Sequence, residues 1–197
     1  MSWIGTAWLG LFMLTLFVCV VMHEFGHALT ARRFGVETQD IILLPIGGVA
    51  RLMKLPEKPI HEFLVAIAGP IVNVVIAFVL AVLIFALPSL DFFPVFGTET
   101  GALEITAASF PATLLWTNLV LAVFNLIPAF PMDGGRILRS LLAIRLKRQK
   151  ATRIASVVGQ ILAVLFFVYG FWSGSFITAF IGIFVFFTAA SEYRMVK

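Results

Sequence analysis

The chain has 197 residues, of which 61% are hydrophobic and only 12% are charged, and its mean hydropathy is +1.06. This composition excludes a water-soluble enzyme, a disordered regulator and a secreted disulfide scaffold, and it indicates an integral membrane protein. The single cysteine cannot form an internal disulfide bond. The net charge of +4 does not indicate nucleic-acid binding, because most Lys and Arg residues lie in short loops between apolar segments.

Long apolar runs without charge predict the membrane-spanning helices, because a helix needs about 20 apolar residues to cross a bilayer. The expected spans cover about 3–33, 60–88, 105–127, 152–172 and 176–193. The last two belong to one run that is too long for a single crossing, and Ser173-Gly174-Ser175 near its middle predicts a tight turn. Residues 1–197 are therefore expected to form a single all-α polytopic domain with about five transmembrane helices.

Two stretches between the spans are too short or too polar to cross a bilayer. Residues 37–55 predict a surface β segment of one or two short strands that turn at Gly47 and Gly48. Residues 134–150 predict a basic helix along the membrane interface, since apolar side chains recur at helical spacing among Arg and Lys residues.

Loop charges predict the orientation in a cell membrane, because Lys and Arg accumulate on the cytoplasmic side. The loops after the first and third spans are rich in Lys and Arg, whereas the only charged residues in the loop from Ser89 to Glu104 are acidic. The sequence thus predicts a multi-pass protein with the N-terminus outside and the C-terminus in the cytoplasm. The β segment and the basic helix are then expected on the cytoplasmic side.

His23, Glu24 and His27 form a His-Glu-x-x-His motif inside the first predicted span. A spacing of four places both imidazoles on one helix face, where they can chelate one Zn²⁺ ion with Glu24 beside the open coordination position. The alternative is a pair of polar residues hydrogen-bonded to neighbouring helices. That alternative gives no reason for a carboxylate inside the bilayer, where insertion costs about 2.5–3.5 kcal/mol.

A catalytic zinc ion usually takes three protein ligands, so a third ligand is expected elsewhere in the chain. Asp40 and Asp91 fall in loops, whereas Asp133 ends the third apolar run. Pro128 and Pro131 interrupt that run, and a broken helix at membrane depth is tolerated only inside protein or at a watery cavity. Asp133 is therefore the predicted third ligand, and a surface turn that caps the basic helix is the alternative.

Three motifs lie on the three central predicted spans. They are His23-Glu24-Phe25-Gly26-His27, then Ala68-Gly69-Pro70-Ile71-Val72-Asn73, then Asn125-Leu126-Ile127-Pro128 with Pro131-Met132-Asp133-Gly134-Gly135-Arg136. In this order and spacing, over roughly residues 15–140, the sequence resembles the site-2 protease family of intramembrane zinc metalloproteases. The resemblance implies one zinc ion per chain held by His23, His27 and Asp133. It also implies that Glu24 is the catalytic carboxylate and that Asn125 assists near the scissile carbonyl.

The resemblance also implies substrates, which are single-span membrane proteins such as membrane-anchored transcription factors or anti-sigma factors. Asn73 matches a recurring asparagine with a structural or a substrate-binding role. Many relatives carry a pair of regulatory domains after the last span and a further span before the metal-binding helix. Neither is present in this sequence, as expected of a compact prokaryotic-type member or of a truncated chain.

Peptide hydrolysis is the reaction expected of such a site, with Glu24 as the base that takes a proton from the attacking water. An extended substrate segment is expected to add as a strand to residues 41–53, where Gly47 and Gly48 leave the backbone accessible. A linker strand that only supports the fold is the alternative for this region.

Two other functions fit an intramembrane cluster of His, Glu and Asp residues. A metal transporter would require polar residues along a pathway on both sides of the bilayer, but the outer halves of the predicted spans are almost purely apolar. A catalytically inactive scaffold would be expected to lack the carboxylate, and Glu24 is present. Both functions remain alternatives to the protease.

Overall fold

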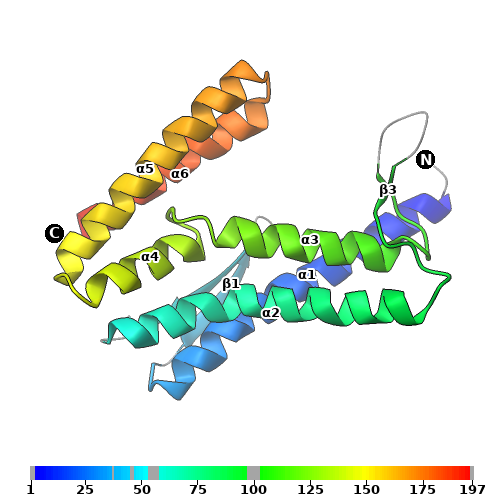
Figure 1. Cartoon of the computed structure of the whole chain (residues 1–197), viewed down its shortest axis with the longest axis horizontal. Coiled ribbons are helices and arrows are strands. Elements are labelled where there is room, and N and C mark those ends of the chain that lie inside the picture. Colours follow the sequence, from blue (N-terminus) through cyan, green and yellow to red (C-terminus); the bar gives the residue numbers. More distant parts are fainter. Residues whose placement is uncertain (1–2, 37, 45–46, 53–57, 97–102, 196–197) are drawn as a thin grey trace.

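The computed structural model describes residues 3–36, 38–44, 47–52, 58–96 and 103–195, and helices dominate it (Figure 1). The helices are α1 (Trp3–Arg33), α2 (Pro59–Ala86), α3 (Phe110–Asn125), α4 (Asp133–Ala143), α5 (Arg148–Trp172) and α6 (Phe176–Met195). The strands are β1 (Thr38–Leu44), β2 (Gly47–Leu52), β3 (Val95–Phe96) and β4 (Leu103–Glu104).

Four helices, α1, α2, α5 and α6, are long and apolar enough to cross a membrane. The chain is therefore a polytopic membrane protein. Helix α3 is apolar but has 16 residues, or about 24 Å at 1.5 Å per residue. It begins at Phe110, next to a proline at its N-terminus, so it is shorter than the span predicted over 105–127. The fifth crossing stays a prediction.

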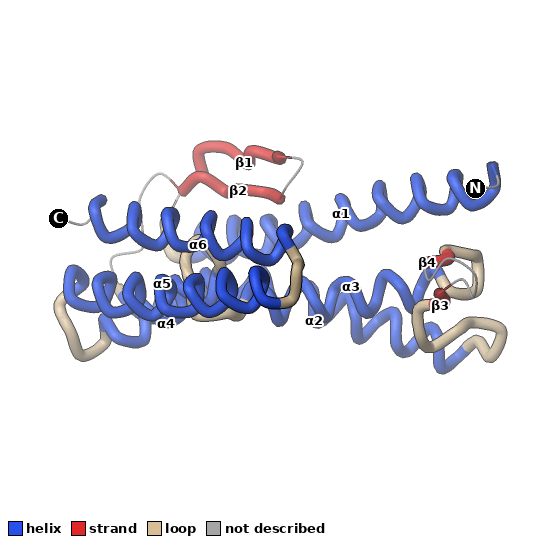
Figure 2. The backbone as a smooth tube through the Cα atoms, turned by 90° about the horizontal axis from the view of Figure 1, so that it is seen from above, coloured by secondary structure: helices blue, strands red, loops and turns tan. Residues whose placement is uncertain are grey.

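Helix α2 lies at the centre of the arrangement, because it packs against α1, α3 and α4. Helices α5 and α6 pack against each other along their length, and they contact the rest of the molecule mainly through α4 and through residues 129–132 before it. Figure 1 shows this pair leaning away from α2 and α3. The N-terminal end of α1 and the C-terminal end of α6 lie at opposite ends of the molecule in both views (Figure 2). Helix α4 and the segment before it therefore join the two halves.

Strands β1 and β2 form an antiparallel pair that packs against α1. Gly47 and Gly48 lie inside β2, paired with Leu44 and Leu43, and the two residues that join the strands lie outside the described residues. The expectation that the chain turns at the two glycines was wrong. Strands β3 and β4 pair at the other end of the molecule and were not predicted, since two-residue strands leave no alternating pattern in a sequence.

The basic helix predicted over 134–150 is shorter in the structure. Helix α4 ends at Ala143, Lys147 has an extended backbone (φ −59°, ψ 140°), and α5 begins at Arg148. The basic residues of the predicted helix are therefore divided between α4, a short connection and the first turn of α5. This break gives α5 its own direction, which the sequence did not reveal.

Candidate metal centre

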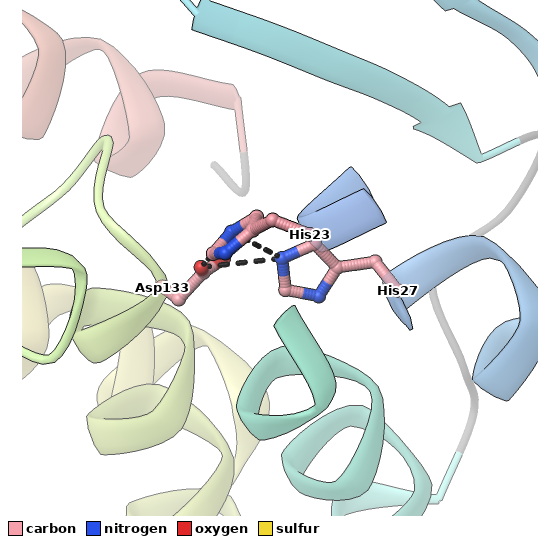
Figure 3. Close-up of side chains that lie close together, drawn as sticks. All are labelled: His23, His27 and Asp133. Carbon is pink, nitrogen blue, oxygen red and sulfur yellow. Dashed lines mark hydrogen bonds and ion pairs between the residues drawn. The ribbon is translucent and has the colours of Figure 1, made fainter. Parts of the chain in front are cut away.

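Three side chains from two distant parts of the chain converge inside the helical bundle (Figure 3). The Nε2 atoms of His23 and His27, on α1, are 3.1 Å apart, and each lies 3.2 Å from Oδ2 of Asp133 at the start of α4. All three residues are buried. The ring planes of the two histidines are inclined at 81°, and each imidazole presents its Nε2 atom to Asp133.

Helix α2 fixes which nitrogen each imidazole presents. Nδ1 of His27 donates to the carbonyl oxygen of Val65 at 2.7 Å, and Nδ1 of His23 donates to Oδ1 of Asn73 at 3.0 Å. A hydrogen bond at Nδ1 leaves the Nε2 lone pair of a neutral imidazole free to bind a metal. Asn73 was predicted to have a structural or substrate-binding role, and its observed contact is with the His23 ring.

The donor set fits a tetrahedral divalent cation. Metal bonds of about 2.0–2.1 Å in a tetrahedral site require ligand atoms about 3.3 Å apart, close to the observed 3.1 and 3.2 Å. Two imidazole lone pairs and a carboxylate oxygen repel one another when they meet in a buried site, and a cation removes that repulsion. Two histidines and one carboxylate leave a fourth position for water or substrate.

Glycines allow α1 and α2 to approach closely at the site. A Cβ atom on Gly69 of α2 would lie 2.6 Å from Nε2 of His23 and would also overlap the His27 ring. A Cβ atom on Gly26 of α1 would lie 2.9 Å from the carbonyl oxygen of Ala68. The space that Gly69 leaves is therefore occupied by the two imidazoles.

Asp133 reaches the histidines because the chain after α3 folds tightly back on the first turn of α4. Gly134 packs directly under the carbonyl oxygens of Leu126 and Ile127, and a Cβ atom on Gly135 would lie 2.8 Å from the backbone of Ala129. The carboxylate of Asp133 also lies in the first turn of α4, where the helix dipole stabilises a negative charge. The two glycines after Asp133 are thus required by packing.

The other predicted site residues lie on α1, α3 and β2. Glu24 is buried on α1, directly after His23. Asn125 is the half-buried last residue of α3, and among the described residues no hydrogen bond joins it to His23, His27 or Asp133. Gly47 and Gly48 lie in β2, which packs against α1.

Sequence reasoning missed two contributors on α2, the carbonyl group of Val65 and the missing side chain of Gly69. A backbone carbonyl carries no sequence signal. Gly69 did carry one, because a Gly-Pro pair inside an apolar helix has a poor helix propensity and needs a packing or functional reason.

Comparison with known proteins identifies the family. The profile of peptidase family M50 matches residues 11–169 of this chain. The chain belongs to peptidase family M50. A zinc metalloprotease of Methanocaldococcus jannaschii is 41% identical over 192 residues, which cover 96% of this chain and 51% of that protein. Stage IV sporulation protein FB of Bacillus subtilis is 30% identical over 145 residues, or 72% of this chain and 44% of that protein.

A solved member of the family has the same fold. The site-2 protease from Methanocaldococcus jannaschii matches with a TM-score of 0.69 and 40% sequence identity over 93% of this chain and 78% of that one. This chain spans about half the length of the two curated relatives named above. The three motifs predict a resemblance to site-2 proteases. The family match and the similarity to the Methanocaldococcus jannaschii structure confirm it.

Proposed function

We propose that the protein is an intramembrane zinc metalloprotease that hydrolyses a peptide bond of a membrane-anchored substrate. The observation that carries the proposal is the convergence of His23 Nε2, His27 Nε2 and Asp133 Oδ2 within 3.2 Å of one another. Two of these ligands lie on a helix that is long and apolar enough to cross a membrane. Membership of family M50 supports both the metal and the reaction.

In this proposal His23, His27 and Asp133 hold one zinc ion. Zinc, when bound, acts as a Lewis acid that makes water a nucleophile near neutral pH and polarises the scissile carbonyl. Glu24, buried beside His23, takes a proton from the attacking water and passes it to the leaving amine nitrogen. Asn125 donates a hydrogen bond to the oxygen of the scissile carbonyl as negative charge develops there.

The substrate is proposed to be a transmembrane segment of a single-span regulatory protein, such as a membrane-anchored transcription factor or an anti-sigma factor. A helical segment has its peptide bonds shielded by its own hydrogen bonds and must be extended before it can be cut. Strand β2, with Gly47 and Gly48, packs against the helix that carries both histidines. An extended substrate that adds to this strand pair would therefore lie beside α1.

The proposed topology has five crossings in a cell membrane, with α3 as the short fifth span. The N-terminus is then outside, the C-terminus is cytoplasmic, and the metal centre is nearer the cytoplasmic face. Support comes from Arg32 and Arg33 in the last turn of α1 and from the basic residues around α4 and the start of α5. The opposite positions of the two termini agree with an odd number of crossings (Figure 1).

Replacement of Glu24 by Ala tests the proposal. The variant should retain zinc but should not cleave a single-span substrate in liposomes, because the ligands remain and the base is lost. Glu104→Ala, in β4 at the other end of the molecule, is the matched control and should cleave normally. Undiminished cleavage by the Glu24 variant would refute the role of Glu24. Absence of cleavage by the parent protein, together with zinc flux across the liposome membrane, would favour a transporter instead.

A further inference from the structure

A buried ion pair links α2, which orients the two imidazoles, to α4, which carries Asp133. Glu62 on α2 and Arg139 on α4 are each only 2% exposed. The guanidinium contacts Oε1 of Glu62 with two nitrogens, Nε at 2.8 Å and Nη2 at 2.6 Å. Neither residue lies among the metal ligands, and neither was singled out by the sequence motifs.

The pair is not explained by stability alone. Removing two charges from water costs several kcal/mol per ion, and apolar residues of similar volume often stabilise a core as well or better. In some proteins a buried ion pair or polar group instead fixes one arrangement of the elements that it joins. Two guanidinium contacts to one carboxylate oxygen make that geometry specific.

The ion pair lies on the same two helices that determine the position of the metal ligands. Helix α2 orients both imidazoles through Val65 and Asn73, and Glu62 lies one turn before Val65. Helix α4 begins with Asp133 and carries Arg139 less than two turns further on. Since α4 packs against α2, the alignment of these two helices determines how far the Asp133 carboxylate is from the imidazoles.

Arg139 also contacts the segment that delivers Asp133 and the last helix. Its guanidinium carbon lies 5.2 Å from the centre of the Phe130 ring, three residues before Asp133, and Nη1 lies 3.3 Å from Oε2 of Glu192 on α6. The second oxygen of Glu62 is contacted at 3.1 Å by Arg148, at the start of α5. Arg139 therefore touches α2, α6 and the turn before its own helix.

We propose that Arg139 is a positioning residue of the metal centre, which holds Asp133 at bonding distance by locking α4 to Glu62 on α2 and to Phe130. The inference rests on the proposed zinc site and deepens it. The contacts within the cluster of Glu62, Arg139, Arg148 and Glu192, which we call the Arg139 cluster, then have different roles. Contacts to Glu62 and Phe130 set the ligand geometry, whereas the contact to Glu192 attaches α6.

The test measures zinc affinity of purified protein in detergent by competition with a chromophoric chelator. Arg139→Gln should bind zinc about 10-fold more weakly, which is the low end of the range for residues that hydrogen-bond a metal ligand, because Arg139 acts through Glu62 and Phe130. Its Co²⁺ derivative should show an altered absorption spectrum at saturating metal, which a loss of stability alone would not produce. Arg139→Lys should be intermediate, because it keeps the charge but loses the two-nitrogen contact. Glu192→Gln is the matched control and should bind zinc within twofold of the parent.

A double variant keeps the inference testable if Arg139→Gln does not fold. Glu62→Leu/Arg139→Met removes both charges and retains apolar volume, so it should fold and still bind zinc at least about 10-fold more weakly. Parent-like affinity and an unchanged Co²⁺ spectrum in the double variant or in Arg139→Gln would overturn the positioning role. If the parent does not bind zinc, or if His27→Ala binds it equally well, the proposed zinc site itself fails.

Discussion

Oδ2 of Asp133 lies 3.2 Å from Nε2 of His23, although 110 residues separate the two in the chain. Nothing in the local sequence brings them together. The approach depends on three further features, which are the close crossing of α1 and α2 at Gly69, the folded segment after α3, and the contact of α4 with α2. Each can be tested separately.

Asp133→Ala should weaken zinc binding by more than the roughly 10- to 100-fold that follows the loss of a residue hydrogen-bonded to a metal ligand, because it removes a ligand itself. The measurement is chelator competition on purified protein. Asp91→Ala, in the loop between α2 and β3, is the matched control and should bind zinc like the parent. Equal affinities for the parent and the Asp133 variant would remove the carboxylate from the ligand set.

Asn73→Leu should weaken zinc binding about 10- to 100-fold, because the His23 ring loses the acceptor that fixes its tautomer. Asn73→Asp keeps an oxygen at this position and should recover part of the affinity. Asn118→Leu is the matched control, since Asn118 is a buried asparagine of α3 whose amide donates to the carbonyl of Leu114. If Asn73→Leu and Asn118→Leu bind zinc equally well, the contact to His23 has no role in metal binding.

Gly69→Ala should abolish stoichiometric zinc binding, because the added methyl group occupies space filled by the two imidazoles. Metal content after dialysis measures this. Gly10→Ala, also within a membrane helix, has no atom within 4 Å of the new Cβ. It should leave metal content unchanged and stabilise α1 by about 0.5–1 kcal/mol. A Gly69 variant that retains a full equivalent of zinc would contradict the predicted overlap.

Zinc should stabilise the folded protein, because the three ligand atoms converge only in the native state. At a free zinc concentration 100 times the Kd, the expected stabilisation is about 2.7 kcal/mol. Thermal unfolding in detergent, followed by circular dichroism with zinc and with a chelator, measures this shift. The His23→Ala variant should unfold at the same temperature under both conditions, and a shift of parental size in that variant would place zinc elsewhere.

The first helix and the turn between α5 and α6 follow directly from the sequence. Helix α1 ends at Arg33, and Gly35 after it has a φ of +73°, which only glycine adopts without strain. Gly174 has a φ of +69° between α5 and α6. Both features depend only on nearby residues, namely the apolar run of the helix and the glycine that follows it, so they can be predicted from a short segment of sequence.

The features that the sequence did not predict depend on contacts between distant segments. The end of α4 at Ala143 lies within a basic run whose composition does not change there. The start of α3 at Phe110 is different, because Pro111 is a helix-start signal that the predicted span over 105–127 did not use. The ligand triad could be predicted because His23, His27 and Asp133 are chemically unusual in an apolar chain. The carbonyl of Val65 and the Glu62–Arg139 pair could not, since neither leaves a distinctive pattern of spacing.

The sequence separations within the Arg139 cluster bear on how the protein is made. Glu62 precedes Arg139 by 77 residues and Glu192 follows it by 53. During translation, the nascent chain therefore already contains Glu62 when Arg139 leaves the ribosome, but Glu192 only follows near the end of synthesis. The three metal ligands are complete much earlier. It follows that the contacts of Arg139 with Glu62 and Phe130 can form before α6 is synthesised, and that the last helix attaches to a centre whose ligand geometry is already set.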